Sequence, residues 1–350
     1  MNNTELVDTY LLDLNYSKEQ IDFLERESGK LTMQEYYKHD EQYTALTDAW
    51  FKNCPNCNIS SKDYTLNCYS SGTEGIITML EKHIDKDTLL ICSNREHQAL
   101  MKVLNKIPNK LIVDYDTEIL KNNFFYIKQV IQTYKKVVVY CIGTTMQGFI
   151  TPSIFLVNLK KILVNSNIEH IMILDDCQGM FYTPRDYSIF DYILYTCHVQ
   201  LPSFDMGVVI SKKEKELPGT KSQKNIKHFL DCFEIFKKED IRKVYNFKYM
   251  CETYFGKYLA CNRLYHHPNC LCADTIWSVH IPHLPKDQKT LQKIEELLNE
   301  YEMHMSYSRD DELECPCLYI RCFQYMIHPQ FLQPGLKAVE NILNTYQILD

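Results

Sequence analysis

The stretch Val137-Val138-Val139-Tyr140-Cys141, followed at once by Ile142-Gly143-Thr144-Thr145, is the part of the sequence that decides the fold. The first segment is an apolar run too short for a buried helix, which is typical of a strand covered on both faces. Similar runs recur between about residue 66 and residue 210, and helical stretches separate them: Thr88–Cys92, Lys110–Val113, His170–Leu174, Tyr192–Tyr195 and Gly207–Ile210. Strands that alternate with helices predict an α/β domain with a mostly parallel sheet covered by helices.

The composition is that of a globular protein. The chain has 350 residues, of which 45% are hydrophobic and 24% charged, enough for one large and one small domain. A net charge of -7 argues against binding to nucleic acid or to anionic membranes. No stretch approaches the roughly 20 apolar residues that span a bilayer. The opening MNNTELVDTY lacks the features of a secretion signal, so we expect a cytoplasmic protein with reduced cysteines.

Three parts can be distinguished along the chain. Residues 1–50 are polar with helical spacing and predict an N-terminal helical arm. Residues 51–245 contain the apolar runs and predict the large α/β domain. Residues 246–350 predict a small C-terminal α+β domain. Its expected strands lie near Thr275–Ile281 and Leu318–Phe323, and its expected helices near 286–304 and 333–347.

Polar residues follow three of the predicted strands. They are Gly143–Thr145 after the first run, Asp175–Asp176 after another and Thr196–His198 after a third. Ligands of open α/β sheets bind beyond the carboxyl ends of the strands. We therefore expect a binding site at this edge.

A fourth motif, Ser70-Ser71-Gly72-Thr73-Glu74-Gly75, precedes the helical run Ile76–Glu81. Such a turn offers unpaired N–H groups and the positive end of a helix dipole to a phosphate. Taken alone, a helix cap without a ligand is the commoner origin of this pattern. The order of the motifs along the chain is more specific than any one of them.

In that order, the motifs resemble those of the pyridoxal-phosphate-dependent group II amino-acid decarboxylases, most closely the compact bacterial-type histidine decarboxylases. The matching segments are Gly72-Thr73-Glu74-Gly75, His97, Ile142-Gly143-Thr144-Thr145 with Gly148, Asp175, and Thr196-Cys197-His198-Val199. The resemblance covers roughly residues 40–215 well and the C-terminal part in outline. It implies a type-I aminotransferase-like fold and a homodimer.

The resemblance also implies roles for particular residues. Gly72 and Thr73 would bind the cofactor phosphate, and His97 would stack on its ring. Asp175 would pair with the pyridine nitrogen, with Asp176 as the alternative. Two further residues, Thr145 and His198, would complete the cofactor-binding set.

The largest departure from the family is Val199, which stands where the family has its Schiff-base lysine. Valine has no nucleophile and no titratable group. We therefore expect a catalytically inactive relative with a binding or regulatory role and an unknown protein partner. Pyridoxal phosphate, if bound, would be held weakly and without a covalent bond. The alternative is an active decarboxylase in which Lys221 or Lys224 has taken over.

Smaller departures concern the surroundings of the cofactor. Ile76 replaces an asparagine that ends the family's phosphate turn, and Ile173 or Leu174 replaces a histidine before the aspartate. Arg321 resembles a strand arginine that grips a substrate carboxylate in the wider fold, although group II decarboxylases do not generally use it so.

Cysteines and histidines do not form a regular metal motif. Cys54-Pro55-Asn56-Cys57 has the spacing of a zinc knuckle. The possible second pair is irregular: His266-His267 with Cys270 and Cys272, or Cys315 with Cys317. We therefore expect free thiols and no metal.

Overall fold

In the computed structural model, the described residues are 40–53, 58–145, 148–179, 185–196, 207–215 and 217, with shorter pieces between 271 and 345. They belong to two compact units. One comprises Gln34–Cys232 and Pro268–Ala273, and the other comprises Met1–Met33, Phe233–His267 and Asp274–Asp350. The expected boundaries near residues 50 and 245 remain predictions.

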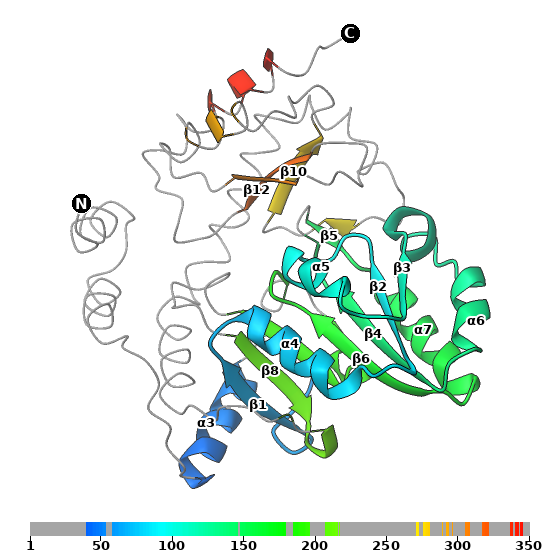
Figure 1. The fold of residues 1–350 in the computed structure, drawn as a ribbon. Coiled ribbons are helices and arrows are strands. Elements are labelled where there is room, and N and C mark those ends of the chain that lie inside the picture. Colours follow the sequence, from blue (N-terminus) through cyan, green and yellow to red (C-terminus); the bar gives the residue numbers. More distant parts are fainter. Residues whose placement is uncertain are drawn as a thin grey trace. The chain divides into compact units, whose positions relative to one another are not determined.

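The larger unit is built on a seven-stranded sheet with the order β1-β8-β7-β6-β4-β2-β3 (Figure 1). Its strands are β1 (Tyr64–Tyr69), β2 (Thr88–Ser93), β3 (Lys110–Val113), β4 (Lys136–Ile142), β6 (Glu169–Asp175), β7 (Tyr192–Thr196) and β8 (Gly207–Lys212). Neighbouring strands from β7 through β3 are parallel, and β8 runs antiparallel to both of its neighbours. The expected mostly parallel sheet is confirmed.

All six apolar runs are strands. Five of them are buried on both faces along most of their length, whereas β3, at the edge of the sheet, alternates exposed and buried residues. Every residue of β2 and of β7 is buried, for example. Strand β1 was not among the predicted runs because two polar residues, Thr65 and Asn67, interrupt its apolar pattern. Both are buried, and Asn67 Nδ2 donates a hydrogen bond to Ser211 Oγ of β8 at 3.3 Å. The partner strand thus accepts a hydrogen bond from a side chain that looks solvent-exposed in the sequence, whereas the buried Oδ1 of Asn67 has no hydrogen-bond partner within the described part of the chain.

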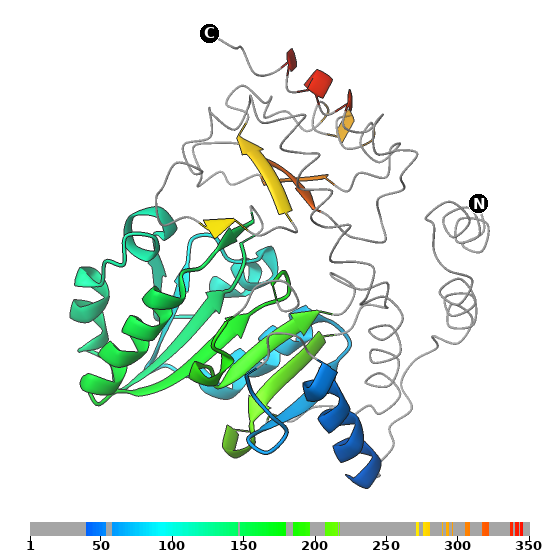
Figure 2. The same cartoon turned by 180° about the vertical axis from the view of Figure 1, so that it is seen from behind.

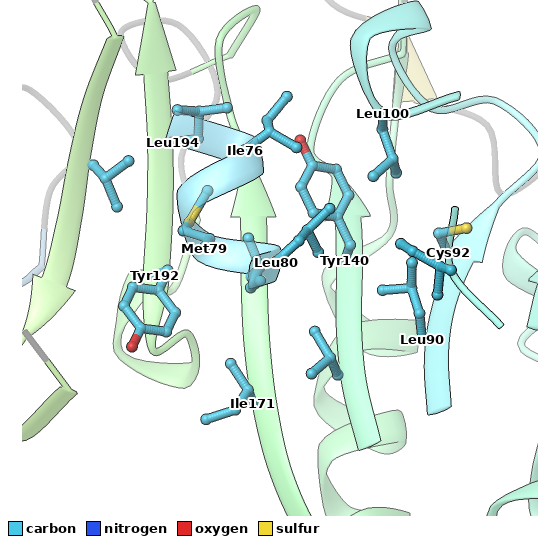
Figure 3. Packing of buried hydrophobic residues seen from close by; sticks show 14 of the residues in the cluster. Ile76, Met79, Leu80, Leu90, Cys92, Leu100, Tyr140, Ile171, Tyr192 and Leu194 are labelled. Atoms are coloured by element: carbon cyan, nitrogen blue, oxygen red, sulfur yellow. The ribbon is translucent and has the colours of Figure 1, made fainter. Parts of the chain in front are cut away.

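Helices cover both faces of this sheet. Helices α4 (Gly72–His83) and α5 (Gln98–Leu104) lie on one face, and α7 (Ser153–Asn165) lies on the other, as the opposite views show (Figures 1 and 2). In Figure 3, side chains of α4 face those of the strands across a buried cluster that includes Ile76, Met79, Leu80, Tyr140, Tyr192 and Leu194. Fully burying one such aliphatic side chain contributes about 1.5–3 kcal/mol.

Smaller elements complete the larger unit. They are α3 (Asp40–Asn53), a π-helical turn (Tyr115–Ile119), α6 (Phe125–Ile131), two 3-10 turns (Tyr187–Ile189 and Lys213–Lys215), and β5 (Phe149–Ile150) paired antiparallel with β9 (Leu271–Cys272). Among the described residues, no helix is long and apolar enough to cross a membrane.

The second unit contains a three-stranded antiparallel sheet with the order β10-β12-β11. Strands β10 (Ile276–His280) and β12 (Cys317–Arg321) correspond to the two strands expected in this part of the chain, whereas β11 (Met305–Ser308) was not predicted. Arg321 is the last residue of β12.

Candidate functional site

The turn that begins α4 is capped from both sides. Ser71 Oγ accepts a hydrogen bond from Glu74 N at 3.2 Å, and the Glu74 carboxylate accepts from Ser70 N and Ser70 Oγ at 2.7 and 2.6 Å. Because helix geometry leaves the first N–H groups without intrahelical acceptors, Gly72 and Thr73 present theirs at the helix end. The cap and an anion-binding turn are therefore compatible here.

This turn packs tightly against the ends of two strands. A Cβ at Gly207, the first residue of β8, would meet the carbonyl oxygen of Ser71 and lie 2.9 Å from Gly72 N. A Cβ at Gly72 would lie 2.8 Å from Oγ1 of Thr196, the last residue of β7. The absence of side chains at both glycines lets the α4 turn sit directly on the sheet edge.

A chain of short contacts leads from this turn to Asp175. Thr196 Oγ1 lies 2.7 Å from Cys177 Sγ, and Cys177 N donates to Asp175 Oδ1 at 3.2 Å. The other oxygen of Asp175 accepts from Tyr140 Oη at 2.8 Å. The side chain of Asp175 is nearly enclosed, with 4% exposure. The phosphate-type turn and this carboxylate thus lie along one edge of the sheet.

Asp176 has a different set of partners. Its Oδ2 accepts from Tyr187 Oη at 2.6 Å, and its Oδ1 lies 3.2 Å from Arg185 Nε as an ion pair without hydrogen-bond geometry. Arg185 also donates to Gly143 O, to Thr144 Oγ1 at 3.1 Å and to Thr151 O at 3.3 Å. Complete burial raises the pKa of Asp176 to about 6, although Arg185 acts in the opposite direction.

Glu96 is a further buried carboxyl at the same edge. Its Oε1 accepts from Ser93 N, Ser93 Oγ and Ile142 N at 3.1, 2.8 and 3.3 Å, which joins the ends of β2 and β4. Burial raises the pKa of Glu96 to about 8, and the negative charge of Asp175 adds to the increase. Glu96 is therefore neutral around pH 7.

The preceding residue, Arg95, pairs with a different acidic side chain. Arg95 Nη2 donates to Asp116 Oδ2 at 2.7 Å, and its guanidinium lies 5.6 and 5.5 Å from the ring centres of Tyr115 and Phe149. The side chain of Arg95 has only 1% exposure. Its Nη2 is thus paired with Asp116, whereas its buried Nε and Nη1 have no hydrogen-bond partner among the described residues.

Two other candidate residues occupy structural positions. The half-buried His97 begins α5, since its carbonyl oxygen accepts from Leu100 N and Met101 N at 2.9 and 3.3 Å. Thr145 is fully buried, and its Oγ1 accepts from Phe149 N at 3.1 Å inside the turn between β4 and β5. Gly148 closes this turn with a φ of 86°, a conformation that glycine adopts without strain.

Several predicted positions lie outside the described residues. These are His198, Val199, Lys221 and Lys224, together with the potential metal ligands Cys54, Cys57, His266, His267, Cys270 and Cys315. Within the parts that are described, no group of three or more His, Cys, Asp or Glu side chains could hold a metal ion.

Sequence reasoning missed some polar side chains around Asp175 and Asp176. Tyr140 stands inside an apolar run, where its hydroxyl is the one sign of a polar partner. Arg185 carries no local signal, because its partners Gly143 and Asp176 lie 42 and 9 positions earlier in the chain. Only the fold brings these residues together.

Comparison with solved structures identifies the architecture. A NifS-like protein from Rickettsia africae superposes with a TM-score of 0.70 over 96% of this chain and 98% of its own, at 14% identity. The chain has a type-I aminotransferase-like fold. Serine palmitoyltransferase from Sphingomonas wittichii matches with a TM-score of 0.65 at 10% identity, over 96% of this chain and 86% of its own. No protein-family model matches the chain, and no curated protein does.

A third solved structure contains pyridoxal phosphate. Cystalysin from Treponema denticola, described with that cofactor, matches with a TM-score of 0.64 at 12% identity, over 95% of this chain and 89% of its own. The described residues fit such a group at both ends, with N–H groups and a glycine cradle at the α4 turn and a buried carboxylate at Asp175.

Proposed function

We propose that this protein binds pyridoxal phosphate without a covalent bond and is a catalytically inactive relative of the pyridoxal-phosphate decarboxylases, with a binding or regulatory role. The observation that carries the proposal is the close approach of the Gly72 turn to Thr196, where a Cβ would have no room, together with the contacts from Thr196 through Cys177 to Asp175. It joins an anion-binding helix start to a carboxylate suited to a protonated ring nitrogen.

In this proposal, each end of the ligand has its own partners. The N–H groups of Gly72 and Thr73 bind the phosphate, and the half-buried His97 stacks on the ring. Asp175, rather than Asp176, holds the ring nitrogen. The pairing of Asp176 with Arg185 and Tyr187 supports this choice, because Asp176 already has a buried cation and a donor.

The inactivity is argued from residue identity. Pyridoxal phosphate supplies an electron sink for amino-acid chemistry when it is bound. In the enzymes that use it, a lysine amine holds the aldehyde, and Val199 offers none. Without this bond, the affinity rests on the phosphate, the ring and the nitrogen contact alone, so we expect weak binding.

Calorimetry with pyridoxal phosphate tests the binding site. The wild-type protein should bind saturably, and Thr73→Asp should abolish binding because its carboxylate would stand in the first turn of α4 and repel the phosphate. Ser153→Asp is the matched control, since it places the same charge in the first turn of α7. Equal affinity of Thr73→Asp and the wild type would refute the assignment.

A second experiment separates the proposal from its alternative, an active decarboxylase with a relocated lysine. The wild-type protein is mixed with pyridoxal phosphate, treated with borohydride, digested and analysed by mass spectrometry. We expect no lysine carrying the cofactor. A protein that is yellow on purification and carries the cofactor on Lys221 or Lys224 after reduction would support the alternative.

We further propose that the protein is a homodimer. The family that the sequence resembles builds its sites at a dimer interface, and the polar, helically spaced residues 1–50 are suited to clasp a partner. Light scattering at micromolar concentration should give about twice the chain mass of 41.5 kDa. A mass near 41.5 kDa would contradict the proposal.

A further inference from the structure

One oxygen of Glu96 is enclosed without any partner. Its Oε1 accepts three hydrogen bonds, whereas Oε2 has no hydrogen bond and no access to solvent. The side chain as a whole is 6% exposed. An ionised carboxylate in this position would leave half of its charge unsolvated, which is costly in a protein interior.

Neither of the two buried arginines nearby forms an ion pair with Glu96. Arg95, the preceding residue, is paired with Asp116, and Arg185 is paired with Asp176. The titratable and charged groups that act on Glu96 or feel its charge come from the three neighbouring strands and their ends: Cys92, Tyr140, Cys141 and Asp175. All of them are acids, so none stabilises a second negative charge.

Asp175 is the carboxyl whose negative charge acts on Glu96. It is the register partner of Ile142, whose N–H binds Glu96, so both carboxyls lie at the ends of adjacent strands. Hydrogen bonds stabilise a carboxylate at Asp175 better than one at Glu96, because Tyr140 and Cys177 each donate to a different oxygen of Asp175. Two like charges this close cannot both be retained cheaply.

We propose that Glu96 and Asp175 form a buried two-carboxyl unit with one negative charge, in which Glu96 keeps the proton and so leaves Asp175 ionised for the ring nitrogen of a bound pyridine. Glu96 is then a positioning residue that acts through Asp175 and does not touch the ligand. This inference rests on the proposed binding of pyridoxal phosphate.

The protonation of Glu96 is tested first, without any ligand. Infrared spectroscopy of the wild-type protein at pH 7 should show the C=O band of a buried protonated carboxyl, which Glu96→Gln removes. Asp175→Asn should shift the titration of that band to lower pH, because the negative charge that disfavours ionisation of Glu96 is gone. An absent band at pH 7, or a titration that Asp175→Asn leaves in place, would overturn the proposal.

The link to the ring nitrogen is tested with two ligands, pyridoxal phosphate and its analogue with C–H in place of that nitrogen. The wild-type protein and Glu96→Gln should prefer pyridoxal phosphate by the same factor, within about twofold, below pH 7. Above pH 8 the wild type should prefer it several-fold more than Glu96→Gln does, since only the wild type gains a second charge. Asp175→Asn should lose the preference at every pH.

The outcomes distinguish the two levels of the argument. If Glu96→Gln loses the preference at pH 7 as Asp175→Asn does, Glu96 is not the neutral member and the inference fails. If neither the wild type nor the variants bind pyridoxal phosphate while the carboxyl band is present, the proposed function and the ring-nitrogen role both fail. Only the protonation of Glu96 is then supported.

Discussion

Replacing Arg185 with methionine removes the cation that faces the fully buried Asp176. In the wild type, the pKa of Asp176 is raised from 3.8 to about 6, so the carboxyl is ionised at pH 7. Without the guanidinium its pKa rises further and the group stays protonated. The cost of the lost ionisation grows with each pH unit above 6 and is on the order of 1 kcal/mol at pH 7. The lost hydrogen bonds to the 143–151 loop add about 1–3 kcal/mol.

The pH dependence distinguishes this mechanism from a simple packing defect. Because the folded state holds the proton more tightly than the unfolded state, stability falls as pH rises, in the wild type between 3.8 and about 6 and in Arg185→Met beyond 6. Urea unfolding should therefore show the Arg185→Met penalty growing from pH 6 to pH 8. Asp176→Asn in the same background should remove that growth. A penalty that is equal at pH 6 and pH 8 would refute the coupling.

Three other changes have defined outcomes. Gly207→Ala should lower the free energy of unfolding by about 1–3 kcal/mol and weaken pyridoxal phosphate binding, because its Cβ meets backbone atoms of the α4 turn. Gly75→Ala should cost less in urea unfolding, because its Cβ would meet only side-chain atoms, at 3.1 Å or more. Val199→Lys should turn yellow with pyridoxal phosphate and give a borohydride-fixed adduct at residue 199, and a colourless protein would mean that the pocket is altered. His83→Gln should lose less stability than the wild type as pH falls from 6.5 towards 4, since burial lowers the pKa of His83 to about 4. If thermal unfolding shows the same loss of stability in both proteins over this pH range, the prediction is wrong.

Hydrophobic pattern was enough to predict most of the large sheet. The run Val137–Cys141 and its counterparts, apart from the edge strand β3, are buried on both faces, so their apolar character shows directly in the sequence. The pattern fails for β1 because Asn67 is buried but bonded to Ser211. It also carries no sign that β8 runs antiparallel to both of its neighbours.

The candidate site was predictable only where its residues form local motifs. The local sequence identifies Gly72 and Thr73 as part of a turn before a helix. It likewise identifies Asp175 and Asp176 as acidic residues that follow a strand. Asp176 is the aspartate that is already paired, because Arg185 contacts it. The spacing of residues in the sequence does not predict this contact. The proton on Glu96 likewise depends on burial by three strands, which is a property of the fold.

The carboxyls at this sheet edge are an argument for a ligand. Glu96 and Asp176 have pKa values raised to about 8 and about 6, from 4.5 and 3.8. At about 1.4 kcal/mol per unit, each costs the folded state about 3 kcal/mol at pH 7. Apolar side chains of similar volume would remove that cost, which is a sizeable part of the total stability of a typical domain. A scaffold that served only to hold its shape would gain from losing them. Their position beside Asp175 and the α4 turn supports the proposal that this edge of the sheet binds a ligand through Asp175, with Glu96 acting on the ligand only through that carboxylate.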